Sequence, residues 1–109
     1  MSDSEFEAKV TQVGDSSVIE LVGTVNRAAK DEMESAYAEA GHVTGEISLD
    51  FNKVDYINST GIAVIVGLLA KARAEGREVS AYGLTDHYRE VFRITRLSDF
   101  MTIHEDAHA

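Results

Sequence analysis

The sequence predicts an α/β domain, a mixed sheet of about four to five strands with helices packed mainly on one face. Three observations support this class. Residues 6–22 have the pattern of an opening hairpin, and helical and strand-like periodicities alternate after it. The chain has 109 residues, the size of a single domain, and it contains no proline. Strands joined through helices are expected to be parallel, with right-handed crossovers.

The first half of the chain is expected to form a hairpin, a helix and a strand. Apolar residues alternate with polar ones over residues 6–10, Gly14-Asp15 indicates a turn, and residues 18–22 supply the second strand. Asn26 is the candidate cap of a helix that Gly41 should end. The apolar positions of this helix recur at helical spacing: Ala29, Met33, Ala36, Tyr37 and Ala40. Residues 46–51 then alternate as a short strand.

The second half is expected to hold two helices and two strands. One helix runs from about Ser59 to Glu75, with Gly76 as its end. Its predicted apolar face consists of Ile62, Ile65, Val66, Leu69 and Ala72, and Val64 and Leu68 extend apolar character beyond that face. Residues 79–82 form a strand, and Thr85 or Asp86 opens a third helix with Tyr88, Val91 and Phe92 facing inward. Leu97, Phe100, Met101 and Ile103 belong to a last strand or a docked tail. The chain is therefore predicted to be one domain, with an ordered core at about 6–103 and a polar, acidic tail at 104–109.

Charge and composition exclude several classes of function. The net charge is −9, which argues against binding to nucleic acid or to an anionic membrane surface. The chain has no cysteine, so disulfides and thiolate chemistry are excluded. No cofactor and no metal site are expected. The polar N-terminal residues 1–5 do not have the pattern of a signal peptide, and the expected location is the cytoplasm.

The most informative segment is residues 54–62, Val-Asp-Tyr-Ile-Asn-Ser-Thr-Gly-Ile. It is typical of a strand that turns sharply into a buried helix, with Ser59 and Thr60 where the helix begins. A helix N-terminus offers unpaired N–H groups and a partial positive charge, so it accommodates an anion. A hydroxyl there is well placed to carry a phosphate, and this indicates a phosphorylation switch. The simpler alternative is that Asn58 or Ser59 only caps the helix.

Two segments resemble enzyme motifs but lack parts that the chemistry needs. A nucleophile elbow needs glycine two positions before and two after the serine, and those positions hold Ile57 and Gly61, so half of the motif is missing. Residues 104–108 read His-Glu-Asp-Ala-His, the zinc-protease pattern, but they have no apolar helix face and end next to the last residue. The chain is therefore not expected to be an enzyme.

These segments resemble the STAS domain, specifically the stand-alone bacterial anti-sigma-factor antagonists. The resemblance covers about 6–103. It depends mainly on residues 49–62, with support from residues 21–26 and residues 91–97. It implies a STAS-like fold, with the opening hairpin followed by parallel strands.

The resemblance implies partner switching. An unphosphorylated antagonist of this family binds an anti-sigma factor that is a serine kinase, which frees the sigma factor and regulates transcription. The kinase ends binding by phosphorylating the serine that matches Ser59, and a metal-dependent Ser/Thr phosphatase reverses this. Thr60 is the second candidate. The alternative is a STAS subunit that is not phosphorylated and acts as a scaffold in a stressosome-like or lipid-transport assembly.

Four positions depart from the family pattern, and one of them is Thr24, which stands where the Gly-Glu-(Ile/Leu)-Asp strand of the family has glutamate. Asn58 and Asn26 stand where the family commonly has aspartate, so two negative charges near the switch are absent. Arg96 stands where a glycine often precedes the last leucine. Partner contacts are expected to cluster at the turn and on the exposed side of the following helix: Asn26, Asn58, Ser59, Thr60, Gly61, Ile62, Ala63, Val64 and Leu68.

Overall fold

The computed structural model describes residues 6–40 and 45–104, and it confirms the predicted order of elements. In chain order the elements are β1 (Phe6–Val13), β2 (Ser16–Val25), a 3-10 helix η1 (Arg27–Ala29), α1 (Lys30–Ala40), β3 (Ile47–Ile57), α2 (Ser59–Ala74), β4 (Val79–Tyr82), α3 (Asp86–Ile94), a 3-10 helix η2 (Leu97–Asp99) and β5 (Thr102–Ile103). The longest of these helices, α2, has 16 residues, and no helix among the described residues is long and apolar enough to cross a membrane.

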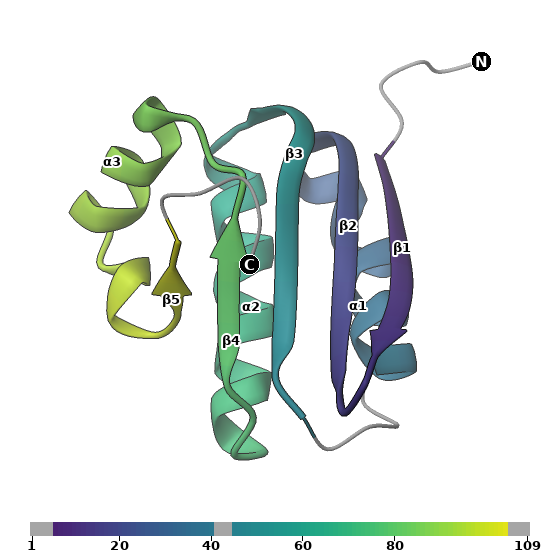
Figure 1. Cartoon of the computed structure of the whole chain (residues 1–109). Coiled ribbons are helices and arrows are strands. Elements are labelled where there is room, and N and C mark those ends of the chain that lie inside the picture. The colour runs from purple at the N-terminus through teal and green to yellow at the C-terminus, as the bar shows by residue number, and fades with distance from the viewer. Residues whose placement is uncertain (1–5, 41–44, 105–109) are drawn as a thin grey trace.

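The five strands form one mixed sheet in the order β1-β2-β3-β4-β5 (Figure 1). The antiparallel β1–β2 hairpin pairs Phe6 with Gly23 and Val13 with Ser16, and Gly14 turns the chain at a φ of 63°. The remaining neighbours are parallel. The C-terminal ends of β2 and β3 therefore meet at one edge of the sheet, where Val25 is the register partner of Ile57.

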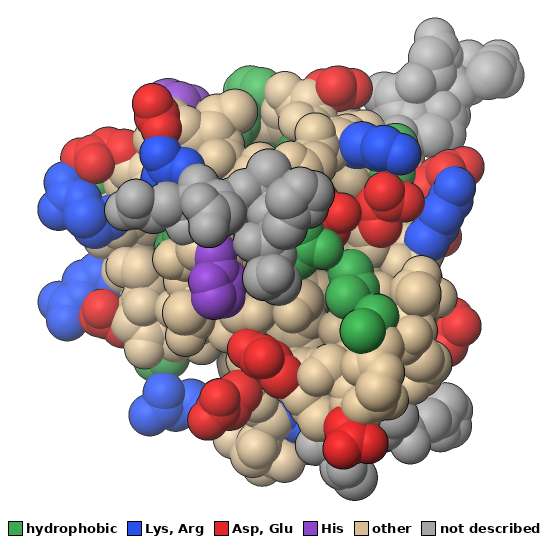
Figure 2. Space-filling view, in the orientation of Figure 1, with side chains coloured by type: hydrophobic (Ala, Val, Ile, Leu, Met, Phe, Trp, Pro, Cys, Tyr) green, Lys and Arg blue, Asp and Glu red, His purple; other side chains and the backbone are tan. Residues whose placement is uncertain are grey.

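The helices pack mainly on one face of the sheet. Figure 1 shows α1 and α2 side by side behind the strands, and α3 beyond β4. The opposite face carries charged side chains of both signs (Figure 2). Lys53 Nζ and Glu20 Oε2, 3.4 Å apart, form one ion pair on β2 and β3. Charged groups on that face remain hydrated, so the main hydrophobic core is on the helix side.

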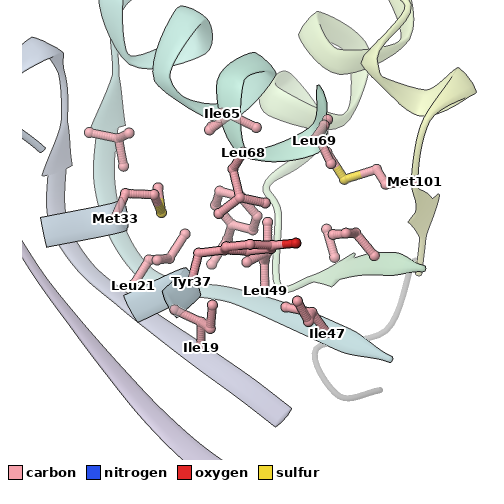
Figure 3. Close-up of a cluster of buried hydrophobic side chains, with 14 of the residues drawn as sticks. Ile19, Leu21, Met33, Tyr37, Ile47, Leu49, Ile65, Leu68, Leu69 and Met101 are labelled. Atoms are coloured by element: carbon pink, nitrogen blue, oxygen red, sulfur yellow. The ribbon is translucent and has the colours of Figure 1, made fainter. Parts of the chain in front are cut away.

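That core lies between the sheet and α1 and α2 (Figure 3). Ile19, Leu21, Ile47 and Leu49 alternate along β2 and β3 and have no exposed surface. They meet side chains from both helices and from the segment before β5: Met33, Tyr37, Ile65, Leu68, Leu69 and Met101. Burying each of these large apolar side chains contributes about 1.5–3 kcal/mol.

Some predicted boundaries and faces were wrong. β3 continues past Phe51 to Ile57, because β2 stays paired with it through two register shifts. Asn26 does not cap an α-helix directly but caps η1. On α2, Val66 was predicted to face the core but is 45% exposed. Leu68 was predicted to face a partner but is buried. The inward stripe of α2 is Gly61, Ile65, Leu68, Leu69 and Ala72, so its angular position differs from the predicted one.

The C-terminal part also differs from expectation in detail. Phe100 is 49% exposed. His104 was assigned to the polar tail, but its N–H donates to the carbonyl of Ala81 at 2.8 Å and so continues the pairing with β4. Residues 105–109, and the predicted helix end at Gly41, lie outside the described residues. Arg96 has a φ of 70°, and this conformation explains why glycine suits that position.

Tyr37 connects α1 to the end of α2 and provides a test of the core. Its hydroxyl donates to Glu75 Oε1 at 2.6 Å, and burial, with that hydrogen bond, raises the pKa of Tyr37 to about 12. A tyrosine in the unfolded chain ionises near a pKa of about 10. The stability contribution is therefore present below about pH 10 and is lost as the pH rises toward about 12.

As the pH rises from about 10 to about 12, we expect the free energy of unfolding to fall by about 2 kcal/mol more in the wild type than in Tyr37→Phe. Urea unfolding of both proteins at several pH values measures this difference. Burial also raises the pKa of Tyr82, but that residue is present in both proteins and cancels in the comparison. Parallel pH profiles would contradict the assignment to Tyr37.

Candidate functional site

The candidate site is the turn between β3 and α2, next to the end of β2. Asn58 is the one residue between the two elements, and its N–H donates to the carbonyl of Val25 at 3.2 Å. That hydrogen bond continues the β2–β3 pairing to the first turn of α2. The predicted sharp turn from a strand into a helix is confirmed, but α2 is buried along one face only and is otherwise half-buried or exposed.

Asn58 is the N-cap of α2. Its backbone is extended, with a φ of −99° and a ψ of −177°, and its Oδ1 accepts from the N–H of Gly61 at 2.8 Å. The same oxygen accepts from Thr60 Oγ1 at 2.8 Å. Capping by Asn58 satisfies one of the free N–H groups at the helix start and contributes about 1 kcal/mol. Of the two caps that the sequence allowed, Asn58 is the one used, so Ser59 is not needed for capping.

The two hydroxyls of the turn have different surroundings. Thr60 Oγ1 donates to Asn58 and accepts from the N–H of Arg27 at 3.0 Å, and this contact links the start of α2 to η1. Ser59 is exposed, and its side chain forms no hydrogen bond to any residue that the structure describes. A modifying enzyme could reach the Ser59 hydroxyl without breaking a contact within the fold.

Gly61 is buried because the backbone of β2 crosses it closely. A Cβ at this position would lie 1.9 Å from the carbonyl oxygen of Val25 and 2.6 Å from its carbonyl carbon. Gly61 is one of the predicted partner contacts. The backbone that approaches is the chain's own, so Gly61 holds the turn in place and has little surface for a partner.

The other predicted contact residues surround this turn at different depths. Asn26 is half-buried, and its Oδ1 accepts from the N–H of Ala28 at 2.9 Å to cap η1. Ile62 and Val64 are half-buried, and Ala63 is exposed. Leu68 is 6% exposed, which corrects its predicted place on the exposed side of α2. The accessible part of the predicted surface is therefore Ser59, Thr60 and Ala63, with half-buried residues at its margin.

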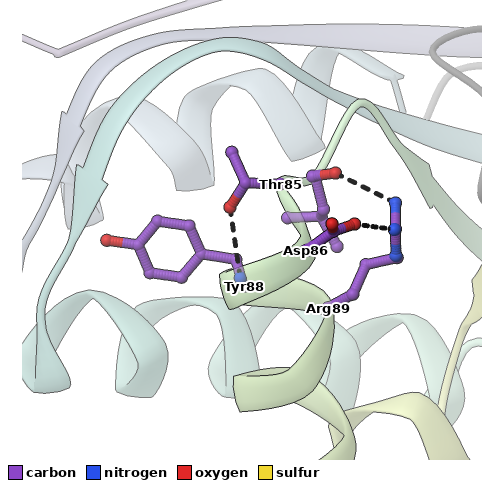
Figure 4. A network of polar contacts seen from close by, with 5 residues as sticks. Thr85, Asp86, Tyr88 and Arg89 are labelled. Atoms are coloured by element: carbon purple, nitrogen blue, oxygen red, sulfur yellow. Dashed lines mark hydrogen bonds and ion pairs between the residues drawn. The ribbon is translucent and has the colours of Figure 1, made fainter.

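The third helix supports the same turn from the other side. Ile57 is the last residue of β3, and its N–H donates to Tyr88 Oη at 3.0 Å. Thr85 Oγ1 caps α3 by accepting from the N–H of Tyr88 at 3.2 Å, and Arg89 pairs with Asp86 in the same turn (Figure 4). The sequence assigned Tyr88 only to the core, and nothing in the pattern indicated that its hydroxyl reaches the end of β3.

A groove between α1 and α2 opens next to Thr60 and has a volume of about 450 Å³. Four of its lining residues are among the predicted partner contacts: Thr60, Ala63, Val64 and Leu68. Its other lining residues are Arg27, Lys30, Met33, Glu34, Tyr37, Gly67 and Lys71. They come from η1, α1 and α2, and β3 separates the first two from α2 in the chain, so no local pattern could have grouped them.

Thr60→Val is expected to lower the free energy of unfolding by about 1 kcal/mol, because it removes both hydrogen bonds of Thr60 Oγ1. Thr60→Ser keeps the hydroxyl and should retain most of the stability. Ser59→Ala is the matched neighbour and should change stability little. Urea unfolding followed by circular dichroism gives all three values. Equal stability of Thr60→Val and Ser59→Ala would contradict a structural role of the Thr60 hydroxyl.

Comparison with known proteins gives relatives over most of the chain. The family model described as "Mlab, STAS domain" matches residues 8–103. The anti-sigma-B factor antagonist of Listeria monocytogenes is 34% identical over 74 residues, 68% of this chain and 62% of that protein. The anti-sigma-B factor antagonist of Staphylococcus aureus is 32% identical over 62 residues, 57% of each chain. This chain thus spans less than two thirds of the length of these curated relatives.

Solved structures show the same fold. The phosphorylated form of the Bacillus cell fate determinant SpoIIAA matches with a TM-score of 0.67 and 20% identity, covering 93% of this chain and 92% of that one. An anti-sigma factor antagonist from Mycobacterium paratuberculosis matches with a TM-score of 0.72 and 18% identity, covering 94% and 88%. Identities this low establish the fold alone. Because the family model matches nearly the whole chain, this protein belongs to the STAS domain family.

Proposed function

We propose that this protein is an anti-sigma-factor antagonist that works by partner switching. In its unphosphorylated form it binds an anti-sigma factor that is a serine kinase, and phosphorylation of Ser59 by that kinase releases it. A metal-dependent Ser/Thr phosphatase restores the binding form. The protein acts by binding and not as an enzyme. The antagonist names of its relatives in Listeria and Staphylococcus support this proposal.

One observation carries the proposal: of the two hydroxyls at the start of α2, only that of Ser59 is both exposed and free of hydrogen bonds to the described residues. Thr60 is also exposed, but its oxygen links Asn58 to Arg27. Phosphorylating Thr60 would break this link, whereas phosphorylating Ser59 would not. The structural cost therefore favours Ser59 as the modified residue.

The physics of the turn explains how one phosphate could end binding without unfolding the domain. A phosphate on Ser59 adds roughly −1.5 to −2 charges at a helix start, where the helix dipole favours negative charge. Its effect falls on the partner, through bulk, desolvation and repulsion from acidic groups there. The exposed Thr60 and Ala63 lie next to it on α2 and would share the same contact surface.

The proposal is tested by incubating the full chain with ATP and the anti-sigma-factor kinase encoded in the same genome. Intact-mass measurement should show the addition of one phosphoryl group. Ser59→Ala should show none, and Thr60→Ser, which keeps the turn's hydrogen bonds, should be modified like the wild type. Continued single phosphorylation of Ser59→Ala would remove Ser59 from the mechanism.

A second candidate function is a STAS scaffold subunit without phosphorylation, in a stressosome-like or lipid-transport assembly. The neutral Asn26 and Asn58 favour it, because they replace two negative charges near the switch. Both amide oxygens are used in capping, which needs no charge. This candidate predicts that the mass of the chain is unchanged after incubation with the kinase and ATP.

A further inference from the structure

The groove between α1 and α2 has the size and lining of a small-molecule site. Its volume of about 450 Å³ lies within the range of about 300–1,000 Å³ that is typical of ligand pockets. Its apolar lining comes from Met33 and Tyr37 on α1 and from Val64 and Leu68 on α2. A polar ligand would lose hydration against these side chains, so the occupant needs an apolar body.

The charges along the groove indicate one anionic group on that occupant. Arg27, Lys30 and Lys71 line the groove together with a single acid, Glu34, although the whole chain has a net charge of −9. Lys30 Nζ pairs with Glu34 Oε2 at 3.0 Å. Within residues 6–40 and 45–104, neither Arg27 nor Lys71 has a carboxylate within ion-pair distance. Two cations therefore remain available to a ligand.

The anionic end is best accommodated at the Arg27 end of the groove. Arg27 is the first residue of η1, and its N–H donates to Thr60 Oγ1 in the first turn of α2 at 3.0 Å. The positive end of the 16-residue helix α2 is therefore next to Arg27, and both favour an anion. At the other end, Lys71 Nζ lies 5.7 Å from the centroid of the Tyr37 ring, so this cation already has an aromatic neighbour.

The size of the groove suits a short apolar chain. Its volume of about 450 Å³ lies in the lower half of the range that is typical of ligand pockets.

We propose that the groove between α1 and α2 binds a small amphiphile with one anionic end, of the class of medium-chain carboxylates. The carboxylate pairs with Arg27, and the chain lies along Val64 and Leu68 toward Tyr37. This site goes beyond the proposed antagonist function and needs no phosphorylation. Because Thr60 lines the groove and follows Ser59, a bound ligand would lie at the margin of the partner-binding surface.

The site is tested by titrating decanoate, below its micelle-forming concentration, into the unphosphorylated full chain and measuring binding by calorimetry. We expect saturable binding. Gly67→Leu should weaken it at least tenfold, since Gly67 lines the groove and a Cβ there has no atom within 4 Å, so the larger side chain enters the groove without a clash. Ala70→Leu is the matched control on α2, because Ala70 is exposed and outside the groove. It should bind like the wild type.

The anionic end is tested with Arg27→Gln and with decanol as the neutral analogue. Arg27→Gln should weaken decanoate about tenfold and leave decanol unchanged, because only the charged head loses its partner. Absence of saturable decanoate binding would overturn the site. Binding to Gly67→Leu at wild-type affinity, decanol binding as tight as decanoate, or binding only of an acidic peptide would each overturn the proposal as well.

Discussion

Replacing Gly61 with alanine is expected to lower the free energy of unfolding by about 3 kcal/mol, a large loss for one methyl group. The added Cβ would lie 1.9 Å from the carbonyl oxygen of Val25. Both contacting groups belong to the backbone, so no side chain can rotate to relieve the clash. The start of α2 must move away from β2, which weakens the hydrogen bond of the Asn58 N–H to Val25 and exposes part of the core. Urea unfolding followed by circular dichroism measures the loss.

Gly67→Ala is the matched control on the same helix and is expected to have the opposite sign. No atom lies within 4 Å of a Cβ at Gly67. Alanine has the higher helix propensity, so this substitution should stabilise the protein by about 0.5–1 kcal/mol. Destabilisation of similar size in both variants would mean that loss of glycine flexibility, and not the contact with Val25, causes the effect at Gly61.

Ser59→Glu is expected to weaken binding to the anti-sigma-factor kinase by two to three decades, which corresponds to about 3–4 kcal/mol. The added carboxylate imitates part of the charge and bulk of a phosphate at the contact surface. Ser59→Ala should bind constitutively, since it keeps the surface nearly unchanged and cannot be modified. Binding of purified full chains to the immobilised kinase, with ATP present, gives the ratio of affinities.

The structure predicts that this loss arises at the interface and not from unfolding. Ser59→Glu and Ser59→Ala should unfold at nearly the same urea concentration, because the serine hydroxyl has no partner among the described residues and the helix start favours negative charge. Equal kinase binding by the wild type, Ser59→Ala and Ser59→Glu would remove Ser59 from the switch. A large loss of stability in Ser59→Glu would instead assign the effect to the fold.

The sequence could predict the order of the elements and the turn that holds the site. Local rules were sufficient there: alternation marked the strands, and Asn58 before an apolar helix marked a cap. The family resemblance added the role of Ser59. The structure shows that the Ser59 side chain is exposed, as the phosphorylation proposal requires. Its modification stays a prediction.

Features that depend on contacts between distant segments could not be predicted. A side chain at Gly61 would clash with Val25 on β2, which lies 36 positions earlier in the chain. The link between Thr60 and Arg27 spans 33 positions. The angular position of α2 was misjudged at Val66 and Leu68, because both are apolar and only packing against the sheet decides which one faces inward. The groove could not be predicted either, because it forms only when α1 and α2 pack side by side.

The isolation of Ser59 within an otherwise connected turn makes it a practical attachment point. Its neighbours Asn58, Thr60 and Gly61 hold the backbone, so the side chain at position 59 can be replaced without loss of the supporting contacts. The chain has no cysteine, and Ser59→Cys would therefore introduce its sole thiol. A fluorophore or photo-crosslinker coupled to that thiol would report directly, in extracts or in living cells, on which molecule covers the start of α2.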